Sequence, residues 1–260
     1  MDVGGFLRTS RQRLFSGSTD KSTAELDFWR GRFTEEKGVL GNEHFEALFT
    51  EQFGVKRSFF AGKRILDIGC GPRGSLEWAS DASRRVGIDP LVDAYREFGI
   101  DLHAMEYVAD PVEHLSFADG SFDVVSSLNS LDHVDDLATA MSEIARVLVP
   151  GGSFLLEVEF GHSPTPAESI EIPAGFAAPL APVFTIASLN QFGLSSGHQV
   201  HRARAEKIPC RQSRRRTPGV LIAHLIREPS APYARTIPPT CRCDASSVAN
   251  NDDQRWFIDP

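Results

Sequence analysis

The chain has 260 residues, of which 41% are hydrophobic, and its formal net charge at pH 7 is −8. This length and apolar content can bury the core of one α/β domain, and the negative charge excludes a general attraction to nucleic acid or anionic membranes. Four cysteines in a chain of this length do not make a disulfide scaffold, and no apolar run is long enough to span a bilayer, so the cytoplasm is the expected compartment.

The N-terminal part of the chain predicts a flexible arm followed by two helices. Residues 1–20 are rich in Ser, Gly and Arg and have no hydrophobic period, which is typical of a disordered arm. A helix is expected from Ser22, because Ser22 and Glu25 have the spacing of a capping box. A second helix is expected at 42–53, where apolar residues recur at helical spacing. These helices either cover the substrate side of a site or pack on the edge of the sheet.

A strand predicted at 64–68 leads into a glycine-rich loop. The loop contains Gly69, Cys70, Gly71 and Gly74. A side chain at a glycine position would hold the backbone away from a ligand, and some turns need the positive φ that glycine adopts readily. Cys70 adds only a small side chain. The pattern therefore predicts a loop that lies close against a nucleoside-containing cofactor.

A second predicted strand, at 85–89, ends in the acidic residue Asp89, which is followed by Pro90. In nucleoside-binding α/β folds, the acid at this point accepts hydrogen bonds from ribose hydroxyls. The glycines also match the dinucleotide fingerprint, and Asp89 lies at a suitable separation for it. However, Asp67 comes just before the first glycine, where its carboxylate would repel a pyrophosphate. It suits S-adenosylmethionine instead, because that cofactor carries an ammonium and a sulfonium and no phosphate.

With these residues in place, the sequence resembles the class I S-adenosylmethionine-dependent methyltransferases, particularly the broad group that acts on small molecules. The segment 117–125 is similar to the approach to that family's fourth strand, and 143–152 is similar to its helix and turn before the fifth. The resemblance covers residues 60–160. It implies that Asp67 orients the loop and the methionine amino group, and that Asp89 binds the ribose hydroxyls.

The resemblance also assigns contacts after the third strand, which is expected at 105–109. The family's contact beside adenine falls on Val112 and Glu113, or its acid falls on Asp110 if the loop shifts by one residue. Arg73 stands in a loop where many members have more closely spaced glycines. It either meets the methionine carboxylate of the cofactor or is a solvated loop residue.

Candidate catalytic residues follow the fourth and fifth predicted strands. The resemblance implies that Leu128 and Asn129 flank the methionine portion of the cofactor. His133 is the best candidate for a general base, since an imidazole with a pKa of about 6.5 is mostly neutral at pH 7; alternatively it caps or packs at a helix start. His162 either binds substrate or lies on a surface loop. No metal site is expected, because the other histidines are scattered along the sequence.

Strands alternate with helices along the core, which predicts a Rossmann-like, doubly wound, mostly parallel seven-stranded sheet with helices on both faces. Strands are expected at 64–68, 85–89, 105–109, 122–127, 153–160, 196–203 and 219–226, and helices at 74–82, 91–98, 135–148 and 184–193. A proline-rich loop or lid is expected at 161–183, a basic exposed loop at 201–216 and a disordered tail at 229–260, so that one domain spans 21–228.

The favoured interpretation is an enzyme that transfers a methyl group from S-adenosylmethionine to an oxygen or nitrogen atom of a small molecule. An association with glycan or natural-product pathways is an analogy from the resemblance. Three alternatives stay open: an RNA or protein methyltransferase, a cofactor-binding protein without catalysis, and an NAD-dependent oxidoreductase, which Asp67 disfavours. The expected ligands are the cofactor and a small-molecule methyl acceptor, with no nucleic acid or membrane.

Overall fold

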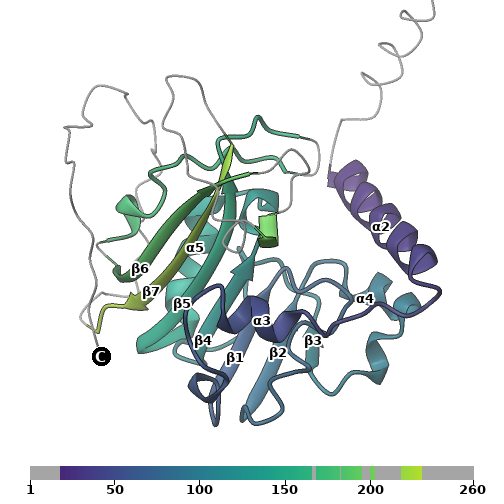
Figure 1. The fold of residues 1–260 in the computed structure, drawn as a ribbon, viewed down its shortest axis with the longest axis horizontal. Coiled ribbons are helices and arrows are strands. Elements are labelled where there is room, and N and C mark those ends of the chain that lie inside the picture. Colours follow the sequence, from purple (N-terminus) through teal and green to yellow (C-terminus); the bar gives the residue numbers. More distant parts are fainter. Residues whose placement is uncertain (1–17, 166–167, 182, 195–199, 203–217, 230–260) are drawn as a thin grey trace, which may run out of the picture.

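One seven-stranded sheet organises the protein (Figure 1). The computed structural model describes residues 18–165, 168–181, 183–194, 200–202 and 218–229. The strand order is β3-β2-β1-β4-β5-β7-β6, in which β1 to β5 pair in parallel and β7 runs antiparallel to both of its neighbours. The strands are β1 (Arg64–Ile68), β2 (Arg84–Ile88), β3 (Glu106–Val108), β4 (Phe122–Leu128), β5 (Leu148–Phe160), β6 (Phe184–Gly193) and β7 (Gly219–Arg227). The predicted mostly parallel, doubly wound sheet is confirmed.

Helices cover both faces of the sheet because the strand side chains alternate between the faces. Helix α5 (Leu137–Val147) packs on one face, where its Ile144 shares a buried cluster with Leu66 of β1. Helix α3 (Phe45–Thr50) crosses the other face, where its Phe49 shares a second cluster with Ile65. In Figure 1, α3 lies in front of the sheet and α5 behind it. Both predicted helical layers are therefore present.

The long N-terminal helix α2 (Ser18–Glu35) lies beside the short helix α4 (Val92–Tyr95), outside the sheet (Figure 1). Trp29 of α2 packs against the buried cluster that contains Tyr95. The predicted capping box is wrong, because α2 already begins before Ser22. Of the predicted N-terminal arm, residues 1–17 lie outside the described part of the chain.

The segment predicted as a helix at 184–193 is strand β6, so that prediction is wrong. Ile186 and Leu189 lie three residues apart, as on a helical stripe, but β6 is the last strand of the sheet and leaves them 37% and 42% exposed. The register with β7 shifts between Ile186 and Ser188, which disturbs the alternation that would reveal a strand. Hydrogen bonding to β7 therefore outweighs the local pattern here.

The segment predicted as a helix at 74–82 forms successive turns instead. Its amide-to-carbonyl hydrogen bonds join residues three apart, as from Glu77 to Gly74 and from Ala79 to Leu76. The hydroxyl of Ser75 bonds the Asp67 carboxylate, which fixes the start of the segment. The short path between β1 and β2 is thus bridged by turns that still bury Leu76 and Ala79.

Two further helix predictions hold with smaller differences. The helix predicted at 91–98 consists of α4 and a 3-10 turn at Arg96–Phe98. Helix α5 confirms the one predicted at 135–148, and its N-cap Asp136 accepts hydrogen bonds from the amides of Ala138 and Thr139. The described residues between 161 and 183 are irregular apart from a 3-10 turn at Ala178–Leu180.

Several predicted segments fall partly or wholly outside the described residues. The strand predicted at 196–203 is described only at Val200–Arg202, which form a 3-10 turn and not a strand. The basic segment after 202 and the tail after 229 are not described. Among the helices that are described, none has both the length and the apolar character needed to cross a membrane.

Leu155 and Leu102 offer a matched test of the buried core. Leu155 of β5 is fully buried, whereas Leu102 is 90% exposed. We expect Leu155→Ala to lower the free energy of unfolding by about 2–5 kcal/mol, through lost burial and the cavity left behind. Leu102→Ala is expected to change it by at most about 0.5 kcal/mol. Urea denaturation measures both; equal effects would contradict the placement of β5 in the core.

Candidate functional site

The carboxyl ends of three neighbouring strands meet at one edge of the sheet. Ile68 of β1 pairs with Ile88 of β2 on one side and with Ser127 of β4 on the other. The amides of Gly69 and Cys70 donate to the carbonyl of Ile88, so the glycine loop turns directly over the end of β2. Ligands of doubly wound sheets bind at such an edge.

A cavity of about 1290 Å³ lies at this edge. It is larger than the about 300–1,000 Å³ of a typical small-ligand site, so it has room for a cofactor and a second small molecule. Most residues that the sequence predicted for the site line it: Asp67, Gly69, Cys70, Gly71, Arg73, Asp89, Pro90, Asp110, Val112, Glu113, Leu128, Asn129 and His133. Gly74 and His162 are the two predicted residues that do not.

Asp67 at the end of β1 is buried, with its carboxylate held by two hydroxyls. Ser75 donates to one oxygen at 2.5 Å and Ser126 to the other at 2.7 Å. Burial raises the pKa of Asp67 to about 6, against the lowering effect of both hydrogen bonds. The residue therefore connects the glycine loop to β4, and its charge faces the cavity from below the loop.

Asp89 after β2 is half-buried in the cavity wall. Its Oδ1 accepts a hydrogen bond from the amide of Leu91 at 2.9 Å. Burial raises the pKa of Asp89 to about 6, and the charge of Glu25 on α2 adds to that rise. Asp89 thus presents an acceptor group in the cavity wall, and its binding of ribose hydroxyls stays a prediction.

The glycine loop requires glycine for both conformation and space. Gly69 and Gly71 have φ of +65° and +55°. A Cβ at Gly69 would lie 2.4 Å from the Cβ of Ser130, and one at Gly71 would lie 2.8 Å from the ring of Trp29. Burial raises the pKa of the Cys70 thiol, which keeps it neutral in the loop.

Gly74 shapes the turn that follows the loop. Its φ is +75°, and a Cβ there would approach the ring of His103 to 3.0 Å. Since Gly74 does not line the cavity, its function in this structure is to allow the chain to turn beneath the loop.

Arg73 is neither directed at a free anion nor solvated. Its guanidinium makes a two-pronged ion pair with Glu36 and donates to the carbonyl of Gly41 at 2.8 Å. The Arg73 side chain is only 11% exposed, and its hydrogen bonds lower the pKa of Glu36 to about 2. The arginine thus fastens the glycine loop to the segment that follows α2.

The acidic side chains of the loop after β3 accept hydrogen bonds from other groups of the protein. Asp110 accepts hydrogen bonds from the amide and hydroxyl of Ser116, at 2.9 and 2.7 Å. Glu113 accepts from the backbone amides of Asp135 and Asp136. Val112 is buried beside them. This loop therefore borders the cavity with a packed surface whose acids already have partners.

After β4 the chain adopts a conformation that few residues tolerate. Asn129 has a φ of +55°, its amide donates to the carbonyl of Glu157 at 2.7 Å, and its side-chain oxygen accepts from the amide of Glu159. Asparagine is among the residues that adopt this region at least cost. The turn places Leu128 and Asn129 in the cavity wall.

His133 and His162 lie on either side of the buried carboxylate of Asp132. The Nε2 atom of His133 is 3.9 Å from Oδ1, and that of His162 is 3.6 Å from Oδ2. His133 is 29% exposed and lines the cavity, whereas His162 is only 10% exposed and is turned away from solvent. Burial raises the pKa of Asp132. The structure therefore brings together two histidines that lie far apart in the sequence.

Sequence reasoning missed two groups of cavity residues. Glu25 and Trp29 of α2 line the cavity. A covering role for the N-terminal helices was one of two expected alternatives, but neither residue was predicted as part of the site. His201 also lines the cavity, and its Nδ1 contacts the buried carboxylate of Glu157, which accepts a second hydrogen bond from Gln52 at 2.6 Å. No short motif links these positions, because they come from three distant segments.

The electrostatics of the loop favour a cationic ligand over a pyrophosphate. Asp67, Asp89 and Glu25 are acidic, and the charge of Arg73 is balanced by Glu36. Dinucleotide folds also place the pyrophosphate at the N-terminus of a helix after the loop, and here that segment forms turns. The residues present thus fit a cofactor with positive charge and no phosphate.

Comparison with known proteins agrees with this geometry. Residues 66–156 match the model of a family described as a methyltransferase domain. This part of the core is therefore similar to a methyltransferase domain. A domain of this kind implies S-adenosylmethionine as the cofactor, which agrees with the acidic character of the loop.

Curated relatives match the methyltransferase domain over part of their length. O-methyltransferase resE of Aspergillus sclerotiorum is 33% identical over 134 residues, which are 48% of this chain and 49% of that protein. The 27-O-demethylrifamycin SV methyltransferase of Amycolatopsis mediterranei is 35% identical over 146 residues, 53% of this chain and 52% of the enzyme. The chain thus spans about half the length of the curated relatives it matches.

Solved structures share the fold of the methyltransferase domain. YcgJ of Bacillus subtilis is 18% identical with a TM-score of 0.50, covering 68% of this chain and 98% of that protein. The [4+2]-cyclase SpnF is 22% identical with a TM-score of 0.50, covering 71% of this chain and 79% of that protein. At these identities the likeness concerns architecture alone, and a cyclase among them shows that architecture does not fix the reaction.

Asp67 gives the protein a pH dependence of stability with a defined sign. Because burial raises its pKa from 3.8 to about 6, its contribution to stability is fully present below pH 3.8 and is lost as the pH rises through about 6. Asp67→Asn has no such titration. We expect the variant to gain up to about 3 kcal/mol relative to wild type between about pH 3.5 and pH 7. Urea denaturation across this range measures it; a variant that loses stability relative to wild type would contradict the raised pKa.

Proposed function

We propose that the protein transfers the methyl group of S-adenosylmethionine to an oxygen or nitrogen atom of a small molecule. The observation that carries the proposal is the placement of the glycine loop, Asp89 and Asn129 around one cavity with room for two ligands. Oxygen is the favoured acceptor atom, because resE and the rifamycin enzyme are both named for O-methylation. These relatives also favour an acceptor of the natural-product type.

The cofactor end of the cavity is assigned to the loop and the strand ends. When bound, S-adenosylmethionine supplies an electrophilic methyl group on its sulfonium. Asp89 accepts hydrogen bonds from the ribose hydroxyls, and the glycines let the backbone approach the methionine portion. Val112 contributes an apolar contact beside the adenine. Leu128 and Asn129 close the methionine end.

The acceptor end is assigned to His133 and to the side chains of α2 that face it. His133 lies in the cavity wall beyond Asn129, where it can act on the acceptor atom. Phe28 and Trp29 of α2 line the cavity from outside the sheet and exclude water from it. His162 supports this end from behind Asp132, at 3.6 Å from its carboxylate.

Binding of the cofactor is expected to depend on the Asp89 carboxylate. Asp89→Asn should weaken S-adenosylmethionine binding by about 10- to 100-fold, because a hydrogen bond to a charged acceptor contributes about 1.5–3 kcal/mol. Calorimetric titration of wild type and variant with S-adenosylmethionine and S-adenosylhomocysteine measures the effect.

The matched control is Asp93→Asn, which makes the same change at a side chain that is 86% exposed and outside the cavity wall. It should leave both affinities unchanged. Binding of NAD with no binding of S-adenosylmethionine would overturn the proposal in favour of an oxidoreductase.

We expect substitution of His133 to affect turnover more strongly than it affects cofactor binding. His133→Ala should lower kcat by about 10²- to 10⁴-fold, the usual contribution of a group that assists proton transfer, with little change in cofactor affinity. S-adenosylhomocysteine release, measured with a panel of hydroxylated small molecules, reports kcat. His114→Ala changes an exposed histidine outside the cavity and should retain full activity.

Two results would contradict this assignment. Unchanged kcat in His133→Ala would remove the residue from catalysis. Turnover of RNA or protein substrates in place of small molecules would favour that alternative class of methyltransferase, and cofactor binding without turnover of any acceptor would favour a protein that binds the cofactor without catalysis.

A further inference from the structure

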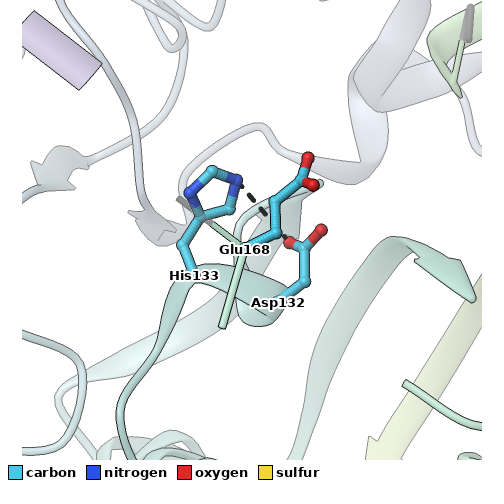
Figure 2. Close-up of side chains that lie close together, drawn as sticks. All are labelled: Asp132, His133 and Glu168. Atoms are coloured by element: carbon cyan, nitrogen blue, oxygen red, sulfur yellow. Dashed lines mark ion pairs between the residues drawn. The ribbon is translucent and has the colours of Figure 1, made fainter. Parts of the chain in front are cut away.

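We propose that Asp132, His133 and Glu168 form a binding site for one divalent transition-metal ion in the wall of the cavity. One donor atom from each side chain lies within 4.8 Å of the other two. Figure 2 shows the three side chains together, with Asp132 and His133 on the turn after β4 and Glu168 on the loop after β5. Binding of the ion at this place does not depend on the proposed methyltransferase activity.

The first argument is that Asp132 is buried without a hydrogen-bond partner. Its side chain is fully buried, and among the described residues neither carboxylate oxygen has a partner. The imidazole nitrogens of His133 and His162 stand 3.9 and 3.6 Å away, beyond the about 2.7–3.2 Å of an N–H···O bond. Buried carboxylates are otherwise paired or bound to metal ions. The spacing around Asp132 suits an ion between the side chains better than direct contact.

The second argument is that the loop carrying Glu168 is fastened to this turn. The amide of Ile170 donates to the carbonyl of Asp132 at 3.1 Å, and the hydroxyl of Ser169 donates to the carbonyl of Val134 at 3.0 Å. These two bonds fix the backbone directly after Glu168, whose carboxylate accepts a hydrogen bond from the hydroxyl of Thr165 at 3.0 Å. The three donors are therefore brought together by tertiary structure and not by chance exposure.

The distances require a contraction of about 1 Å. Three ligand atoms at about 2.0–2.2 Å from one ion lie about 3.3–3.8 Å from one another. The donor atoms here lie within 4.8 Å of one another, so side-chain rotations that move them by up to about 1 Å suffice. His133 and Glu168 are 29% and 30% exposed, which leaves them free space for this movement.

The surrounding charges also favour a cation. Asp132 and Glu168 contribute two carboxylates. Lys21 of α2 opposes them, since its Nζ donates to the carbonyl of His133. That ammonium is 3.4 Å from Asp135, however, so its charge is already paired.

The donor set selects the class of ion. An imidazole nitrogen favours zinc, iron, nickel or copper, whereas carboxylate oxygens alone favour magnesium, calcium or manganese. A site with one imidazole and two carboxylates therefore suits a first-row transition ion such as Mn²⁺ or Zn²⁺. Nε2 of His162 lies 3.6 Å from Oδ2 of Asp132, so this imidazole is a neighbour of the site that makes no hydrogen bond to the proposed ligand.

The place of the site gives it a chemical use, which rests on the proposed function. His133 and Glu168 both line the cavity, so an ion held between them borders the acceptor end. A hydroxyl of the acceptor that coordinates the ion would have a lowered pKa. Its oxygen would then be a stronger nucleophile at neutral pH, with the proton released to solvent, and with the ion bound His133 would assist the reaction as a ligand and not as a base.

Mn²⁺ is the probe for the test, because the resonance of the free ion in electron paramagnetic resonance disappears on binding. Full-length protein stripped of metals, without cofactor or acceptor, is titrated with Mn²⁺. We expect one equivalent to bind, Asp132→Asn and Glu168→Gln to weaken binding at least about tenfold, and Asp93→Asn to bind as wild type. Zn²⁺ should displace the bound Mn²⁺, and Mg²⁺ should do so only in large excess.

Several outcomes would overturn the site. Binding of less than one equivalent, or equal binding by wild type and Glu168→Gln, removes it, and equal displacement by Mg²⁺ contradicts the class of ion. Glu168→Gln carries the test if Asp132→Asn unfolds, since Glu168 is on a partly exposed loop. Because no cofactor is present, metal binding without methyl transfer would refute the proposed function alone, and methyl transfer without metal binding would refute the site alone.

Discussion

The arrangement of the cavity depends on one buried carboxylate. Asp67 ends β1 and accepts a hydrogen bond from Ser75, beyond the glycine loop, and another from Ser126 on β4. The two bonds hold both ends of the loop against the sheet, although the carboxylate loses its hydration on burial. With the loop fixed there, the parallel register of β1 and β2 brings Asp89 to the same edge. The cofactor end of the cavity is thus determined by hydrogen bonds within the sheet.

The features that could be predicted from the sequence are those with local signals. Short apolar strands that end in an acid or a glycine were located to within a residue, as for β1 and β2, because buried parallel strands form continuous apolar runs. The residues that follow those strands also lie where they were expected, since the carboxyl ends of parallel strands share an edge.

The features that could not be predicted depend on contacts between distant segments. β6 is a strand because it pairs with β7, and its own apolar spacing indicates a helix. Arg73 pairs with Glu36, and no local sequence pattern shows that their two segments lie side by side. His133 and Glu168 are brought together by backbone bonds between two loops. In each case a contact between distant segments determines the structure, and the local sequence gives either no signal for it or the wrong one.

The walls of the cavity differ in origin, and this bears on how such a protein can diversify. One wall consists of strand ends that also build the hydrophobic core, so substitutions there disturb the whole fold. The other includes α2, which lies outside the sheet. Exposed positions of α2 can therefore be substituted without disturbing the strand ends. The architecture separates the part under strict structural selection from the part free to evolve new acceptor preferences.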